Sequence, residues 1–496
     1  MKLLVNKTKI ISIITFVICF LGFIFSYEEI NGTQSEIYVF SVIGVIELLF
    51  CLITLRNVTG RNFSLYGIFI IFAFLFHYGQ CLMWAFGIHY PNEIGTANIY
   101  TKGIPSGEII AKSQLLTLIG LLSFHTGALL VMKKAKGTKR QEKFDINIIR
   151  TNRKAQALYT ASVIALAISL PLMYLYQIRD ITVNARYGYG AILYNEIVVA
   201  SQNNTIQLLR QMYFPAIVGL LISTGYRKKT VYFCYFNFAI FVLLNLMAGN
   251  RGEWIYPLAI LIWMHHSFVK KINVKKLVVY VLIGIIVVSI SVGIRNIRNN
   301  GINIQSLLNA MLIEDNPIVS AIFEMGGSMR PTILITESGW GIYPYGNTYI
   351  LALLGMVTER VVKVFIPDYV SVSYWFSHYF LRLNFGIGFS LVAEAFINFG
   401  PYLSMFFLFG LGIIYSFLIS SEQIDINKEP IKMFLKICVL NALILSVRNY
   451  ILGSLKHFIF SSFSIYLVTL IILSVYKRTK PKRNKSNIYQ VDSVED

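Results

Sequence analysis

The sequence predicts an all-α, polytopic integral membrane protein with about twelve transmembrane helices. The chain of 496 residues is 56% hydrophobic and only 14% charged, with a mean hydropathy of +0.62. This is far more apolar than the usual composition of a soluble globular protein. Apolar stretches of about 20 residues, enough to cross a bilayer, also recur along almost the whole chain. The composition therefore leaves no room for a separate soluble catalytic domain.

Twelve apolar stretches are predicted to span the membrane. The first follows Lys2, Lys7 and Lys9 as in a signal peptide, but no small-residue cleavage site comes after it, so we expect an uncleaved first span. The predicted spans cover residues 10–25, 37–55, 63–86, 109–132, 157–176, 208–224, 231–248, 254–269, 277–294, 391–420, 433–451 and 458–476. We expect one membrane domain over residues 1–496, with a basic tail at 477–496.

The charge distribution predicts the topology of these spans. If the N-terminus is cytoplasmic, the connections on that side include "KKAKGTKRQEKFDINIIRTNRK", "YRKK" and "KKINVKK", and they hold most of the lysine. Lysine and arginine concentrate in cytoplasmic loops, so this orientation is favoured and both termini are expected in the cytoplasm. The net charge of +20 is explained in this way and predicts no nucleic-acid partner.

The basic residues on the predicted outer side differ in type. They comprise 10 Arg and 4 Lys, against 8 Arg and 22 Lys inside. Arginine has a planar fork suited to bidentate binding of phosphate or carboxylate. This bias predicts an anionic ligand on the outer face; pairing with lipid phosphates or local acids remains the alternative.

Residues 295–390 form one long outer segment. Within it, residues 349–366 approach span length but carry Glu359, Arg360 and Lys363. A single additional span there would place the basic tail outside. We therefore expect amphipathic or re-entrant helices in this segment, with two shorter spans as the alternative.

The stretch "AGNRGEW" places a charged pair between two predicted spans. Asn250 can cap the following span and Glu253, three residues later, completes a capping-box pattern. Capping does not explain Arg251, which lies at the positive end of that helix, where an anion is favoured. Arg251 is therefore a candidate phosphate ligand.

Two further arginine clusters lie in the outer segment. Arg295 and Arg298 are three residues apart and share a helical face, which suits a diphosphate. Arg330 follows Gly326 and Gly327, which relax the backbone beside it. Ordinary helix ends with snorkelling arginines are the alternative reading of both.

A carboxylate is predicted just inside the tenth span. Glu394 and Asn398 are four residues apart, hence on one face of an otherwise apolar helix. A buried carboxylate is costly in a membrane, which makes Glu394 a candidate proton acceptor or arginine partner. Arg448, at the outer end of the eleventh span, is the expected partner; a structural Glu–Arg pair is the alternative.

Aromatic side chains with polar tips are frequent in the outer segment. Such rings offer an apolar face and a hydrogen-bonding group to a sugar. The candidates for sugar contact are Trp340, Tyr345 and His378, together with Asn398. An interfacial aromatic belt is the alternative for each ring.

Several kinds of site are not indicated. The five cysteines lie unpaired in apolar stretches, the seven histidines are scattered, and no Walker A, GxSxG, HExxH or CxxC motif occurs. We expect no metal site and no cofactor.

The order of "GNRGE", "MRPTILITESG", "YPYGNTYILALLG" and "GFSLVAEAFINFG", with "FLFHYGQ" upstream, resembles the bacterial O-antigen and capsular polysaccharide polymerases of the Wzy type. The resemblance covers most of the chain. The positions that carry it are Gly249, Arg251, Arg330, Gly346, Glu394, Asn398 and Phe399.

The resemblance implies a glycosyltransferase of the bacterial cytoplasmic membrane. Similar proteins transfer a growing glycan from undecaprenyl diphosphate to the non-reducing end of a new lipid-linked repeat, for O-antigen, capsule or exopolysaccharide. Under this reading Arg251, Arg295, Arg298, Arg330 and Arg448 bind diphosphate, and Glu394 or Glu253 acts as base or orients an arginine, without a metal.

The expected partners are the undecaprenyl-diphosphate-linked oligosaccharide and membrane lipids; the resemblance leaves open a chain-length regulator and other assembly proteins. Two other functions compete with this reading. One is an O-antigen ligase-like glycosyltransferase and the other is a flippase for the same lipid-linked substrate. A flippase exposes its cationic site to both faces, and the sequence shows no such second site.

Overall fold

The computed structural model describes residues 6–90, 104–134, 144, 146–187, 204–248, 253–273, 317–383, 386–420 and 424–478. Within these ranges every regular element is a helix, and ten helices are long and apolar enough to cross a membrane. The predicted all-α polytopic membrane fold is confirmed.

Two of the twelve predicted spans differ from the other ten. The predicted eighth span is α12 (Ile255–Phe268), whose 14 residues rise only about 21 Å, less than a hydrocarbon core of about 30 Å. The predicted ninth span, residues 277–294, lies outside the described residues.

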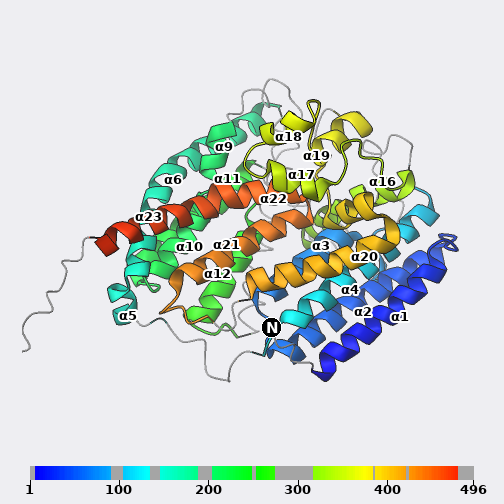
Figure 1. Cartoon of the computed structure of the whole chain (residues 1–496), viewed down its shortest axis with the longest axis horizontal. Helices are drawn as coiled ribbons and strands as arrows, with labels where there is room; N and C mark the ends of the chain where they lie inside the picture. Colours follow the sequence, from blue (N-terminus) through cyan, green and yellow to red (C-terminus); the bar gives the residue numbers. More distant parts are fainter. Residues whose placement is uncertain are drawn as a thin grey trace, which may run out of the picture.

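The long helices form two groups joined by a pair of central helices (Figure 1). One group comprises α1 (Lys7–Ser26), α2 (Gln34–Thr59), α3 (Leu65–Trp84), α4 (Gly107–Val131) and α20 (Leu391–Ile419). The other comprises α5 (Ile146–Thr151), α6 (Arg153–Tyr187), α9 (Asn204–Arg210), α10 (Tyr213–Ser223), α11 (Lys228–Ala248), α12 and α23 (Ser464–Arg478). Between them lie α21 (Pro430–Val447) and α22 (Ile451–Phe458), and η4 (Ile459–Phe463) leads from α22 into α23.

Serine and threonine caps set where several helices begin. Ser64, Ser106 and Ser390 accept hydrogen bonds from backbone N–H groups in the first turns of α3, α4 and α20. Thr33 and Glu36 form a reciprocal capping box at the start of α2. These side chains satisfy N–H groups that a helix leaves unpaired at its N-terminus.

Helices within the first group differ in how far they are buried. In the apolar 18-residue stretch of α3 and of α4, 83% of the residues are buried, against 22% in that of α1. Helices α3 and α4 are therefore interior helices, and α1 turns most of its surface outward.

The tight contact of α4 with α20 depends on glycine. A Cβ at Gly127 would lie 2.0 Å from the Phe409 carbonyl oxygen, and one at Gly412 would lie 1.9 Å from that of Phe124. Small residues permit such close approach between membrane helices.

Contacts at the helix ends support the predicted alternation of spans. The Lys9 ammonium, near the start of α1, donates to the carbonyls of Leu130 and Met132 at the end of α4. The start of α6 similarly meets the start of α21, where Lys154 pairs with Glu429 at 2.8 Å. We call this the lower end of the bundle; the charge distribution predicts that it faces the cytoplasm.

The long segment after residue 316 covers the opposite, upper end (Figure 1). Its helices are α15 (Pro317–Gly326), η2 (Gly327–Met329), α16 (Arg330–Ser338), α17 (Thr348–Gly355), α18 (Arg360–Phe365), α19 (Val372–Tyr374) and the π-helix η3 (Trp375–Phe380). None of these described helices is long enough to cross a membrane. α15 packs on α3, and α16 lies against α4 and α20 with Ile333 and Ile335 fully buried. The described part of this segment thus consists of short helices, and their amphipathic or re-entrant placement in the membrane stays a prediction.

Candidate active site at the upper end

Helix α20 is broken near its upper end. Gly400 has a φ of 70° and Pro401 follows it. Proline has no N–H, so it cannot bond the carbonyl of Ile397 as a helical residue would. The N–H of Gly341 donates to that carbonyl instead, at 2.9 Å. The break therefore anchors the loop before α17.

The Trp340 indole lies against this break. A Cβ at Gly400 would be 3.2 Å from the indole ring, so only glycine accommodates both the positive φ and this contact. Trp340 is nevertheless 61% exposed. Its free ring surface is available to a ligand, which fits the predicted sugar contact.

Below the break, the Glu394 carboxylate is 1% exposed and has two hydrogen-bond donors. The Thr348 hydroxyl donates to one oxygen at 2.8 Å, and the N–H of Ile451 donates to the other at 2.8 Å. Thr348 begins α17 and Ile451 begins α22, which has no side-chain cap of its own. Glu394 thus supplies the negative charge that a helix N-terminus favours.

Asn398 completes this network. Its Oδ1 accepts from the Thr348 N–H at 2.8 Å, and its Nδ2 donates to the Thr348 hydroxyl at 2.8 Å and to the Glu394 carbonyl at 2.6 Å. The amide therefore holds α17 against α20. Its amide oxygen and nitrogen are bonded within the protein, which favours a positioning role for Asn398.

Arg448 is not the partner of Glu394 that the sequence suggested. Its guanidinium lies 5.7 Å from the Phe76 ring centroid and is exposed, while its carbonyl accepts from the N–H of Phe389. Within the described residues no ion pair joins Glu394 to an arginine. The Arg448 side chain is thus free to bind an anion.

Arg330 adjoins the same part of α3. Gly326, four residues earlier, packs so closely that a Cβ there would lie 2.2 Å from the Gln80 nitrogen. Phe76 and Gln80 are four residues apart and hence on one face of α3. The Nε of Arg330 is buried without a hydrogen-bond partner among the described residues. Arg448 and the segment before Arg330 thus pack against the same half of α3.

Glu253 pairs with Arg210, which is not among the predicted site residues. Its carboxylate lies 3.4 Å from Arg210 at the end of α9, and the Arg210 guanidinium also stacks 4.1 Å from the Tyr176 ring centroid. Arg210 and Glu253 are 43 residues apart in the chain, so no local motif reveals that they pair.

The capping box expected at "AGNRGEW" is not formed by Glu253. The helix α12 begins at Ile255, and its N-cap residue is Trp254. Glu253 precedes both and turns to Arg210 instead. Arg251 and Asn250, together with Arg295 and Arg298, lie outside the described residues.

The other predicted sugar contacts lie in an aromatic cluster over the upper end. Tyr345 packs edge-on against Tyr343 and Tyr369, with ring centroids 5.4 and 5.9 Å apart. Burial raises the pKa of both Tyr343 and Tyr369, so these phenols stay neutral, and Tyr343 donates to the Val370 carbonyl at 2.6 Å. His378 is half-buried, and its Nδ1 lies 2.9 Å from the Leu383 carbonyl oxygen. Tyr345 and His378 are thus part of the packing, and Trp340 is the more accessible ring.

The upper end thus combines exposed arginine, a buried carboxylate network and an accessible indole. Among the described residues no group of three or more His, Cys, Asp or Glu side chains is arranged to hold a metal ion. Guanidinium groups supply fixed positive charge suited to phosphate oxygens.

The fold and this end define an all-α polytopic membrane protein whose upper end carries a cationic, aromatic-rich surface. A family model described as O-antigen polysaccharide polymerase Wzy matches residues 8–480. The chain belongs to this family, whose members are polysaccharide repeat-unit polymerases with glycosyltransferase-like activity. No curated protein and no solved structure matches the chain significantly.

Proposed function

We propose that this chain polymerises undecaprenyl-diphosphate-linked oligosaccharide repeats on the outer face of the bacterial cytoplasmic membrane. The growing glycan passes from its lipid carrier to the non-reducing end of a new lipid-linked repeat. A hydroxyl of the new repeat attacks the anomeric carbon of the growing chain. The bond from that carbon to the diphosphate breaks, and undecaprenyl diphosphate leaves with the electron pair.

The position of Arg448 is the observation that carries this proposal. Phe389 bonds its carbonyl, and Glu394 holds the N–H of Ile451 three residues later, so the backbone on both sides is fixed. The guanidinium itself remains exposed. A preorganised cation of this kind stabilises charge that develops on a leaving diphosphate.

Two diphosphates require more than one cation. We assign Arg330 and Arg448, with Arg251, Arg295 and Arg298, to the donor and acceptor diphosphates. Diphosphate is a weakly basic leaving group, so these charges replace both a metal ion and a general acid.

The attacking hydroxyl still needs a proton acceptor. Glu394 uses both carboxylate oxygens to hold α17 and α22, which makes it a positioning residue. Glu253 has 40% of its side chain exposed and a single arginine partner. We therefore assign the base to Glu253, and sugar contact to Trp340.

Reconstitution of the purified chain in liposomes with a lipid-linked oligosaccharide tests this proposal. A ladder of products separated by one repeat is expected on a gel. Substrate that crosses the membrane without forming a ladder would contradict the proposal and favour a flippase. A single transfer to a different lipid acceptor would favour a ligase-like enzyme.

A further inference from the structure

A cavity of about 340 Å³ lies at the lower end of the bundle, far from Glu394 and the other proposed site residues. Five helices begin or end around it. It is lined by Arg150 from α5, Gln156 and Tyr159 from the start of α6, Ser223 at the end of α10, Arg227 before α11, and Tyr476 near the end of α23. The cavity therefore lies where these helices meet the membrane–water boundary.

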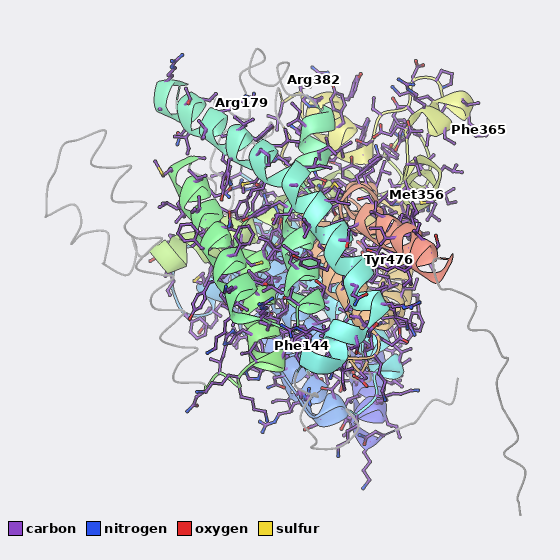
Figure 2. All side chains as sticks on the ribbon, turned by 90° about the vertical axis from the view of Figure 1, so that its left-hand side faces the viewer. Phe144, Arg179, Met356, Phe365, Arg382 and Tyr476 are labelled. Atoms are coloured by element: carbon purple, nitrogen blue, oxygen red, sulfur yellow. The ribbon has the colours of Figure 1, made fainter. Side chains whose placement is uncertain are left out.

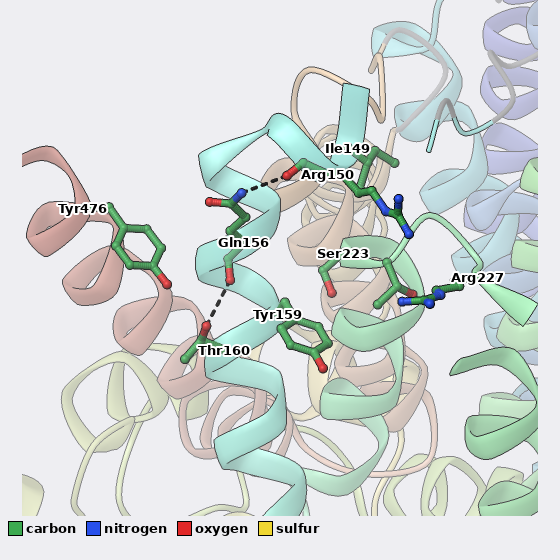
Figure 3. Close-up of a pocket in the computed structure, with 9 residues that line it drawn as sticks. Ile149, Arg150, Gln156, Tyr159, Thr160, Ser223, Arg227 and Tyr476 are labelled. Atoms are coloured by element: carbon green, nitrogen blue, oxygen red, sulfur yellow. Dashed lines mark hydrogen bonds between the residues drawn. The ribbon is translucent and has the colours of Figure 1, made fainter. Parts of the chain in front are cut away.

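The cavity is cationic. Figure 3 shows the Arg150 and Arg227 side chains reaching into the same side of it. None of its described lining residues is acidic, and neither arginine has an ion pair with a carboxylate within the described chain. The 21-residue helix α11 starts at the next residue, Lys228, so its positive N-terminal end also faces this region.

An apolar groove of about 420 Å³ continues from this cavity. The two share Tyr159, and the groove then follows one face of α6 through Val163 and Ala167 to Leu170. Leu220 of α10 and Phe233 of α11 lie opposite, and Lys229 and Thr230 near the start of α11 also line it. Figure 2 faces this side of the molecule. Val163 is 40% exposed and Phe233 is 47% exposed, so the groove opens outward.

The length of the groove matches one leaflet. From Tyr159 to Leu170 a helix rises about 16 Å, which is close to half of a hydrocarbon core of about 30 Å. A cationic cavity at the boundary followed by an apolar groove of this depth matches a phospholipid, with its phosphate in the cavity and one acyl chain in the groove.

We propose that this cavity and groove bind one anionic phospholipid from the leaflet at the lower end. The guanidinium groups of Arg150 and Arg227 hold the phosphate, and the charge distribution places this leaflet on the cytoplasmic side. The proposal goes beyond the polymerase function, because the binding site lies at the opposite end from the proposed catalytic residues.

The head-group half is tested by native mass spectrometry of the delipidated full chain in detergent. Dioleoyl phosphatidylglycerol should be retained as one tight copy, and dioleoyl phosphatidylcholine at least tenfold more weakly. Arg150→Gln with Arg227→Gln should weaken phosphatidylglycerol retention at least tenfold. Lys228→Gln removes a neighbouring exposed cation that does not line the cavity and should have little effect.

The acyl-chain half needs a second pair of variants. Val163→Trp fills the groove and should abolish the tight copy. Ile164→Trp changes a neighbour of similar exposure, 46% against 40%, that does not line the groove, and it should leave the tight copy intact. All the substituted side chains are exposed, so we expect the variants to fold. Thermal unfolding of each variant checks this.

Three results would overturn the proposal. One is equal retention of the two lipids. Another is full phosphatidylglycerol binding after both arginine substitutions. The third is a rise in unfolding temperature with inorganic phosphate alone that equals the rise with phosphatidylglycerol. This result would make the cavity a site for a free anion.

Discussion

The carboxylate of Glu394 in α20 accepts a 2.8 Å hydrogen bond from the backbone N–H of Ile451, the first residue of α22. Its other oxygen accepts from Thr348, the first residue of α17. One buried acid thus joins the starts of two helices to a third. Arg448, three residues before Ile451, is positioned by the same contact.

Replacing Glu394 with Gln should destabilise the upper end. Gln has one acceptor oxygen in place of two, so either the Ile451 N–H or the Thr348 hydroxyl loses its acceptor. An unsatisfied buried group of this kind costs about 1–3 kcal/mol. Thermal unfolding in detergent should show a lower midpoint, with polymerisation reduced in parallel. Thr348→Ala should cost less, and the double variant should show less than the sum. An unchanged midpoint with activity abolished would instead identify Glu394 as the base.

Replacing Gly400 with Ala should also destabilise the chain. The residue has a φ of 70°, and the Trp340 indole would lie 3.2 Å from the new Cβ. With a ψ of −175°, this backbone conformation is essentially restricted to glycine and costs about 1–3 kcal/mol for a residue with a Cβ. Gly410→Ala, in the same helix with open space around it, is the matched control and should be neutral. Equal unfolding midpoints for the two variants would show that the break in α20 does not require glycine at position 400.

Replacing Trp340 with Ala should weaken substrate binding. Loss of stacking worth about 1.4 kcal/mol corresponds to a tenfold rise in KM for the lipid-linked oligosaccharide. Tyr379→Ala removes an aromatic side chain that is also 61% exposed, and it should leave KM unchanged. If both variants raised KM equally, the effect would belong to a general interfacial belt.

Replacing Glu253 with Gln should lower kcat by roughly 100-fold or more, as expected for loss of a general base. The unfolding midpoint should change little, because a partly exposed ion pair contributes at most about 1 kcal/mol. Glu337→Gln, an exposed acid in α16, is the control and should retain full activity. Full activity in Glu253→Gln would show that Glu253 is not the base and that its role is limited to the contact with Arg210.

Replacing Arg448 with Lys keeps the charge but loses the bidentate fork. We expect at least a tenfold loss of polymerisation, and the same for Arg251→Lys. Arg56→Lys, at the exposed lower end of α2, should be silent. Full activity in Arg448→Lys would show that a point charge suffices.

The spans were predictable from the sequence because their determinants are local. Hydropathy over about 20 residues identifies an apolar helix, and lysine in short loops identifies a side. The short helices after residue 316 were also predictable, since Glu359, Arg360 and Lys363 interrupt the apolar run.

The partners within the site were not predictable, because they come from distant parts of the chain. Glu394 meets residues 46 and 57 positions away, and no periodicity links them. Pro401 marks the break in α20 within the sequence itself, but the N–H that satisfies the freed Ile397 carbonyl belongs to Gly341. Arg210 was one of several outer arginines until the structure placed it beside Glu253.

In the proposed reaction, arginine side chains at the upper end take the place of a metal ion in stabilising the leaving diphosphate. The most direct test is the product ladder of the purified chain with and without EDTA. An unchanged ladder in EDTA is the predicted result. A ladder that disappears in EDTA and returns with added Mg²⁺ would contradict it.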